Sequence, residues 1–151
     1  RYVSAFDTDS PMQYHIMNQL AENAYKDKVP KALVNTQFCG TRQNKGGSGC
    51  ILGITKDNFT PEAIILGVLF GIAKELYDFG LSHTAQKCYI VASGNAIEKI
   101  SVLKDILSET FNMPVHISTT TEEAAAGASL FAAVCTGYLK EISDISNYIK
   151  Y

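Results

Sequence analysis

Two stretches of the chain place small and polar residues where ligand chemistry could take place. The first, Ser93-Gly94-Asn95, follows a short apolar run at residues 88–92 and precedes a helical pattern. A glycine at the end of a buried parallel strand lets a flat ring or a phosphate approach the backbone, and the next helix offers free N–H groups. A tight strand-to-helix turn also favours glycine and asparagine. From these residues alone, both interpretations stand equally.

The second stretch, residues 37–49, contains four glycines and two cations. One interpretation is a backbone-lined loop beside an anionic ligand, with Gly40, Thr41 and Arg42 as phosphate or domain-interface contacts. The other is a surface turn whose glycines supply positive φ angles. The pattern is no G-x-x-x-x-G-K-S phosphate loop, which favours the surface turn.

Residues for acid–base or nucleophilic catalysis do not gather in the sequence. His15, His83 and His116 lie far apart, and none has a carboxylate or nucleophile at motif spacing. Glu122 and Glu123 are adjacent helical residues that point about 100° apart, so they do not share a site; the helix dipole accounts for at least one of them. We therefore expect no catalytic residue in this chain.

The cysteines indicate neither zinc nor a disulfide framework. Cys39, Cys50, Cys88 and Cys135 show no C-x-x-C spacing, and scattered thiols of this kind are typical of a reducing, cytoplasmic compartment. We expect four free thiols and no metal site.

Composition excludes several classes of protein. The 151 residues are 46% hydrophobic and 19% charged, with a formal net charge of -2, as in one ordinary globular domain. Neither a nucleic-acid backbone nor an anionic membrane is favoured as a partner. No apolar run reaches the roughly 18 residues of a spanning helix, and no signal peptide is recognisable. The chain does not begin with Met, from which we expect an excised domain.

Hydrophobic periodicity and breakers predict the elements that position these residues. Ser10-Pro11 begins a helix ending near Tyr25, and Thr60-Pro61 begins an all-round apolar, buried helix ending at Gly80. Residues 32–36 and 50–54 are expected strands. A strand–turn–helix–strand–helix unit occupies residues 87–133, which predicts a parallel sheet with ligands beyond its carboxyl ends. A terminal helix is expected over 141–151.

Several motifs of this unit, taken in order, resemble one family. Ser-Gly-Asn-Ala after an apolar strand, then Phe-Asn-Met-Pro-Val at residues 111–115 and Glu-Glu-Ala-Ala-Ala-Gly-Ala at 122–128 resemble the carboxyl-terminal domain of the FGGY carbohydrate kinases. The sedoheptulokinase-like branch is the most similar. The resemblance extends back through residues 38–42, 49–54 and 58–61, and covers about three quarters of the chain.

The resemblance implies a fold and an activity. The fold is an α/β domain of the ribonuclease-H-like, actin-type ATPase class, with a mostly parallel sheet flanked by helices. Residues 1–151 would form one truncated second domain, with 1–10 and 141–151 as its less defined edges. The implied parent is a carbohydrate kinase that transfers phosphate from ATP, with Mg²⁺, to a hydroxyl of a sedoheptulose-like ketose or a related sugar or polyol. The fragment alone is expected to be inactive.

The resemblance also assigns roles to residues. Gly94 matches the glycine that the family places against adenine and ribose, and Ser93 and Asn95 flank it. Gly127 lies in the family's small-residue helix, where close helix packing is favoured over direct nucleotide contact. The family's asparagine on the adenine side has no counterpart at residues 98–101, so Asn95 or a main-chain group would replace it.

Expected partners and alternatives complete the prediction. ATP and a sugar held mainly by an absent amino-terminal domain are expected, a homodimer is left open, and neither nucleic acid nor membrane is expected. Two alternatives remain from the sequence: a non-kinase actin-like ATPase domain, and an α/β binding or oligomerisation module without a nucleotide.

Overall fold

A computed structural model describes residues 10–41, 45–80, 88–120 and 122–149. Along the chain it contains α1 (Ser10–Lys26), β1 (Leu33–Asn35), β2 (Cys50–Leu52), α2 (Pro61–Gly80), β3 (Ile90–Ala92), α3 (Asn95–Lys99), α4 (Leu103–Phe111), β4 (Val115–Ile117), α5 (Glu123–Cys135) and the 3₁₀ helix η2 (Ile142–Asn147).

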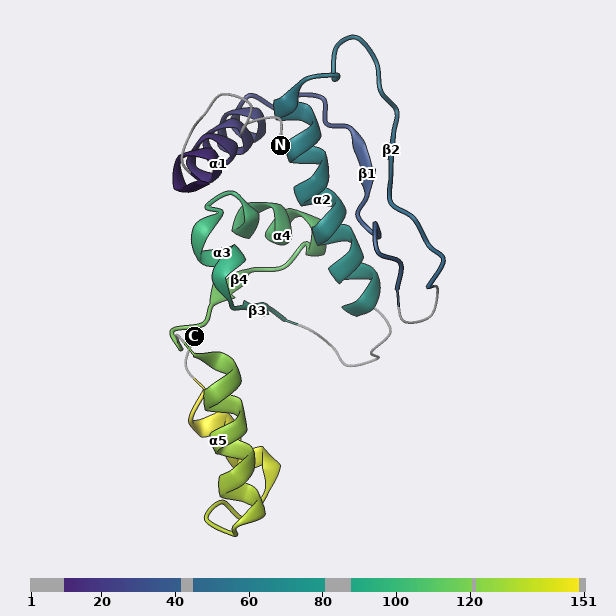
Figure 1. Ribbon diagram of the computed structural model, residues 1–151. Helices are drawn as coiled ribbons and strands as arrows, with labels where there is room; N and C mark the ends of the chain where they lie inside the picture. The colour runs from purple at the N-terminus through teal and green to yellow at the C-terminus, as the bar shows by residue number, and fades with distance from the viewer. Residues whose placement is uncertain (1–9, 42–44, 81–87, 121, 150–151) are drawn as a thin grey trace.

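Helix α2 is the centre of the fold, with α1 on one side and the β1–β2 pair on the other (Figure 1). Its bounds confirm the predicted helix, because Thr60 caps its first turn: the Ala63 N–H donates to Thr60 Oγ1 at 3.2 Å. The core formed with α1, α3, α4 and β4 consists of Ala21, Ala24, Leu66, Leu69, Ala73, Ile97, Val102, Leu103, Ile106, Leu107 and Val115.

The prediction that α2 is buried on all sides is wrong. Ile72, Leu76 and Phe79 are exposed, because α1, α4 and β1 cover only part of the helix surface. Among the described residues, nothing else packs against the last turns of α2 enough to bury these side chains. Helix α2 therefore has more apolar surface than the neighbouring elements of this chain bury.

Gly67 and Gly71 confirm the expected close packing of α2. A Cβ on Gly67 would lie 2.4 Å from the Ala32 carbonyl oxygen, and one on Gly71 would lie 2.5 Å from that of Val34. Only a residue without a side chain allows the β1 backbone to approach the helix this closely. The two glycines thereby seat β1 on α2.

The sheet differs from the mostly parallel sheet predicted. The described residues form two separate pairs: β1 and β2 are antiparallel, with Val34 opposite Ile51, whereas β3 and β4 are parallel, with Val91 opposite His116. The reason lies in the connections. β1 and β2 are joined by a loop, which permits an antiparallel pair, whereas β3 and β4 are joined through helices α3 and α4 as a parallel crossover requires.

The strand predicted over residues 88–92 is also less covered than expected. Ile90 and Ala92 pack on the core, but Tyr89 and Val91 are exposed. Since side chains alternate along a strand, β3 has one packed face and one open face. The expected cover on both faces is therefore wrong for the described part of the chain.

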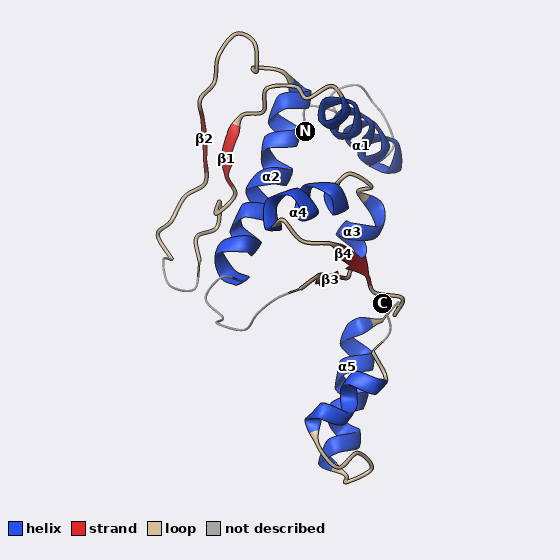
Figure 2. Ribbon diagram, turned by 180° about the vertical axis from the view of Figure 1, so that it is seen from behind, coloured by secondary structure: helices blue, strands red, loops and turns tan. Residues whose placement is uncertain are grey.

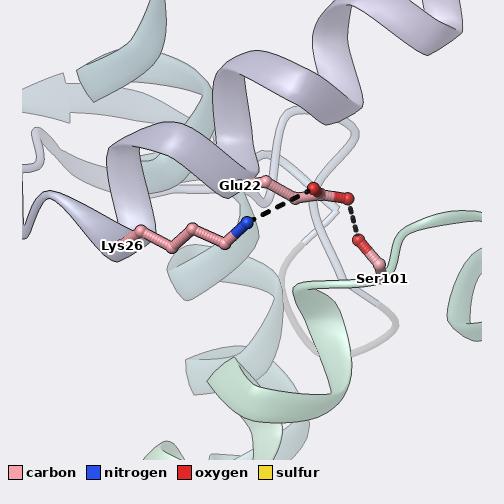
Figure 3. A network of polar contacts seen from close by, with 3 residues as sticks. All are labelled: Glu22, Lys26 and Ser101. Atoms are coloured by element: carbon pink, nitrogen blue, oxygen red, sulfur yellow. Dashed lines mark hydrogen bonds and ion pairs between the residues drawn. The ribbon is translucent and has the colours of Figure 1, made fainter.

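The single helix predicted between the two strands of this unit is divided at Ile100, whose backbone is extended. Side chains of α1 hold this break: Asn18 Nδ2 donates to the Lys99 carbonyl at 2.6 Å, and the Ser101 hydroxyl donates to Glu22. Lys26 contacts the same Glu22 carboxylate at 4.0 Å, and Figure 3 shows this network of three residues. The break is thus fixed by a distant helix.

The carboxyl-terminal part forms an arm, which we define as α5 and η2. Helix α5 extends away from the rest of the molecule (Figure 1, and from behind in Figure 2), and none of its residues is buried. Instead of the helix predicted over 141–151, η2 is a short 3₁₀ helix with a capping box between Glu141 and Asp144. In the described part of the chain, no helix combines the length and hydropathy needed to span a membrane.

Candidate functional site

The turn Ser93-Gly94-Asn95 lies at the carboxyl end of the parallel pair. Ala92 is opposite Ile117 in the register, and the Ser118 N–H donates to the Ala92 carbonyl at 2.9 Å. The segments that follow β3 and β4 therefore leave the sheet side by side. This is the edge at which ligands bind in parallel α/β sheets.

Gly94 has a conformation that favours glycine and an open side. Its φ is 95° and its ψ is 164°, a region that side chains avoid. The Gly94 carbonyl accepts the Ile97 N–H at 3.1 Å and so begins α3. A Cβ built on Gly94 would meet nothing within 4 Å, and Ser93 and Asn95 are exposed. The backbone conformation of this turn therefore requires glycine at position 94, and the space beside the Gly94 Cα is open to a ligand.

Glu123 joins this turn to the arm. Its Oε1 accepts a hydrogen bond from the Gly94 N–H at 3.2 Å. Sequence reasoning assigned at least one of Glu122 and Glu123 to the helix dipole and missed this contact. The available signal was topological: α5 begins just after β4, whose carboxyl end adjoins that of β3, so an acidic residue in the first turn of α5 can reach the turn after β3.

Gly127 lies one helical turn beyond Glu123, on the same side of α5. It is exposed, and a Cβ there would meet nothing within 4 Å. The close helix packing favoured from the sequence therefore has no partner in the described part of the chain. What the structure brings together is the Ser93–Asn95 turn and the first turns of α5.

Gly40 and Thr41 belong to a different part of the fold. They lie in the connection of the antiparallel pair, which packs on α2, whereas the Ser93–Asn95 turn belongs to the parallel pair. Gly40 has a φ of 70° and donates its N–H to the Gln37 carbonyl at 3.0 Å. Arg42, the cation predicted to contact phosphate, lies outside the described residues.

Glycines of this loop have structural reasons of their own. Gly40 supplies the positive φ of a turn, and a Cβ on Gly49 would lie 2.2 Å from the Phe38 ring and 2.7 Å from the Asn35 carbonyl oxygen. Tight folding therefore accounts for both glycines, which supports the surface-turn interpretation.

Other titratable groups are dispersed. His15 is exposed on α1, His83 lies outside the described residues, and the His116 ring contacts that of Tyr89 edge to face, with centroids 5.3 Å apart. The four cysteines are exposed and unpaired. Within the described ranges, no three His, Cys, Asp or Glu side chains converge as metal ligands would.

Cavities of about 420, 460 and 410 Å³ lie around α1, α2 and α4. In the first, the Tyr25 hydroxyl donates to Glu109 Oε2 at 3.1 Å. Burial, and next the hydrogen bond to Glu109, raise the pKa of the Tyr25 phenol. The residues that line these hollows do not include Ser93, Gly94 or Asn95. The turn lies instead at the carboxyl edge of the parallel pair, where ligands bind in parallel α/β sheets.

Comparison with known proteins gives the fold. No family model and no curated protein sequence matches the chain, but solved structures do. The xylulose kinase of Lactobacillus acidophilus aligns over 94% of this chain with a TM-score of 0.71 and 18% identity. The gluconate kinase of the same organism aligns over 93% of this chain with a TM-score of 0.70 and 19% identity. The glycerol kinase of Plasmodium falciparum, solved with ADP, aligns over 97% of it with a TM-score of 0.64 and 18% identity.

This is the fold of a sugar-kinase segment. The chain spans about 29% of the length of each of these three kinases, so its fold corresponds to one part of a sugar kinase. The expected resemblance to carbohydrate kinases is confirmed at the level of the fold.

Proposed function

We propose that this chain supplies the nucleotide-side wall of an ATP-dependent carbohydrate kinase of the FGGY type. The observation that carries the proposal is the open Gly94 turn at the carboxyl edge of the parallel pair, with nothing within 4 Å of its Cβ position. The sugar-kinase fold supports it, since a glycerol kinase of the same fold was solved with ADP.

The proposed contacts follow from the geometry of the turn. A flat adenine or ribose would lie against the Gly94 backbone, because no side chain stands in front of it. Ser93 and Asn95 are exposed on either side and offer a hydroxyl and an amide for hydrogen bonds. Gly127, one turn along α5 from Glu123, would form the neighbouring wall of the nucleotide site.

The proposed reaction is phosphoryl transfer from ATP to a sugar hydroxyl, in a ribonuclease-H-like second domain most similar to the sedoheptulokinase-like branch. Mg²⁺ would arrive with the phosphates of ATP. The catalytic base and most of the sugar contacts would come from outside this chain. Alone, the chain is therefore expected to give no sugar-dependent ATP turnover in a coupled assay.

A pair of matched glycine variants tests the nucleotide site. Gly94 and Gly137 both have positive φ, 95° and 76°, and both have open space at the Cβ position. Gly94→Val and Gly137→Val should therefore lose similar stability, about 1–2 kcal/mol. Only Gly94→Val should weaken ATP binding, by at least about tenfold, which corresponds to about 1.4 kcal/mol.

The measurement is titration of fluorescent ATP, competed with unlabelled ATP, into the chain and both variants. Equal affinities in all three would reduce Gly94 to a turn glycine and overturn the nucleotide site. Failure of the unsubstituted chain to bind ATP would favour the α/β module without a nucleotide.

A further inference from the structure

The Glu123 carboxylate has more hydrogen-bonding capacity than the described protein groups use. Glu123 is partly buried and accepts the Gly94 N–H through Oε1 at 3.2 Å. In the part of the chain that the structure describes, no other group donates to this carboxylate and no cation pairs with it. An ionised carboxylate can accept about four hydrogen bonds, and one that is partly removed from water is stabilised by each further donor. Oε2 can therefore take a donor from a ligand.

This oxygen lies beside the proposed nucleotide. Oε2 belongs to the same carboxylate as the oxygen that contacts Gly94, so it adjoins the turn on which the base or ribose is placed. Space is open at Gly94 and at Gly127, one helical turn further along α5, since a Cβ on either glycine would meet nothing within 4 Å. A ligand can therefore approach the Ser93–Asn95 turn and the first turns of α5 together.

The charge of Glu123 selects which part of a nucleotide lies here. A carboxylate repels phosphate oxygens but accepts hydrogen bonds from neutral hydroxyls, as the acidic residue that binds ribose in dinucleotide-binding folds does. The neutral donors of ATP are its ribose hydroxyls and the amino group of adenine. A base that lies flat on Gly94 turns its face toward the turn rather than its amino edge, which leaves the ribose hydroxyls to meet Glu123.

We propose that Glu123 determines the specificity of this site: Oε1 holds the Gly94 turn, and Oε2 accepts a hydroxyl of the ribose. The site then prefers ribonucleotides over nucleotides that lack the ribose hydroxyls, and the phosphates extend away from Glu123. This inference rests on the proposed nucleotide site, to which it adds a residue that sequence reasoning did not assign to the nucleotide.

The ratio of two affinities tests this role. The chain is titrated with unlabelled ATP and with 2′,3′-dideoxy-ATP, which lacks both hydroxyls, and the amide NMR signals are followed. We expect the signals of Ser93, Gly94 and Asn95 to shift, and ATP to bind about tenfold more tightly than the dideoxy analogue. In Glu123→Ala the two nucleotides should bind equally. A residue that only supported the fold would, when replaced, weaken both nucleotides alike and leave the ratio unchanged.

Two further variants make the comparison specific. Glu122→Ala is the matched control, because it removes the same charge from an exposed carboxylate one residue earlier, and it should keep the full preference for ATP. Glu123→Gln retains one acceptor oxygen for the Gly94 N–H, so the turn stays held even if it needs that bond, and the preference for ATP should still fall. The amide spectrum of each variant shows whether it is folded.

The possible results separate this inference from the proposed function. If ATP shifts no signal of the unsubstituted chain, the nucleotide site is overturned, and the role of Glu123 with it. If ATP and the dideoxy analogue bind equally at residues 93–95, or if the preference survives in both Glu123 variants, the nucleotide site stands and the role of Glu123 is overturned. Those last results are also the ones expected if Oε2 meets a group from elsewhere in a longer protein.

Discussion

Helix α2 of the body and helix α5 of the arm are both apolar in sequence, yet only α2 has buried residues. Helix α2 places Ala63, Leu66 and Ala73 in the core, at 0–3% exposure, whereas α5 buries no residue. The difference is in what surrounds each helix: α2 has α1, α4 and β1 as neighbours, and α5 has η2. Apolar composition indicates that a helix is suited to burial, but the elements packed against the helix determine whether its side chains are buried.

The largest expected effect separates a core side chain from an arm side chain. Ile106 is 0% exposed, so Ile106→Ala should lower the free energy of unfolding by about 3 kcal/mol through lost burial and a residual cavity. Phe131→Ala, at an exposed position of α5, should change it by less than about 0.5 kcal/mol. Urea denaturation measures both. Similar losses at the two sites would erase the distinction between body and arm.

The second expected effect has opposite signs in the two regions. Gly67→Ala would force a methyl group to 2.4 Å from the Ala32 carbonyl oxygen, with a loss of about 1–3 kcal/mol. Gly127→Ala meets nothing within 4 Å and removes a flexible residue from a helix, which should stabilise by about 0.5–1 kcal/mol. Thermal unfolding of both variants checks the signs. A destabilised Gly127→Ala would show that α5 is packed after all.

A third, local effect concerns the hydrogen bond that joins arm and body. Glu123→Ala removes the acceptor of the Gly94 N–H, a charge-assisted bond worth about 1 kcal/mol at this partly exposed site. Hydrogen exchange of the Gly94 amide should therefore accelerate about five- to tenfold. Glu122→Ala, one residue earlier, is the control and should leave that amide unchanged. Equal exchange in both variants would mean that the arm starts independently of the turn.

The smallest expected effect depends on pH and belongs to the body alone. The raised pKa of Tyr25 means that the folded state favours the neutral phenol. The stabilisation is therefore fully present below the ordinary phenol pKa of about 10 and is lost as the pH rises through the higher folded value. The stability difference between the chain and Tyr25→Phe should be constant from pH 7 to 9 and decrease above about pH 10. A flat difference up to pH 11 would contradict this.

Local signals in the sequence predicted the helices of the body well. Thr60 and Pro61 fix the start of α2, Gly80 its end, and Gly67 with Gly71 its packed side, because capping and close approach depend on residue types at fixed spacings. The parallel pair and the Ser93–Asn95 turn were likewise predicted, since a strand–helix–strand unit leaves few other topologies.

What the sequence left out depends on partners distant in the chain. The break at Ile100 is held by Asn18 and Glu22 of α1, and the Gly94–Glu123 bond joins two separate loops. The small residues of α5 indicate that another element or a ligand can approach the helix closely, but they do not identify it. The same limit explains the overestimated burial of α2 and β3, because periodicity cannot say whether a cover exists.

The spacing of Gly67 and Gly71 along α2 matches the spacing of alternate residues along β1 and the residue before it. Four residues of helix advance about 6 Å, and two residues of strand advance about 6.6 Å. Gly67 and Gly71 therefore lie about as far apart as the Ala32 and Val34 carbonyls that pack against them. The helical and strand repeats coincide over this interval. A one-residue insertion or deletion within either interval would displace one contact while the other stayed in place, so a change of length here should disrupt the packing of β1 on α2, as a side chain at either glycine would.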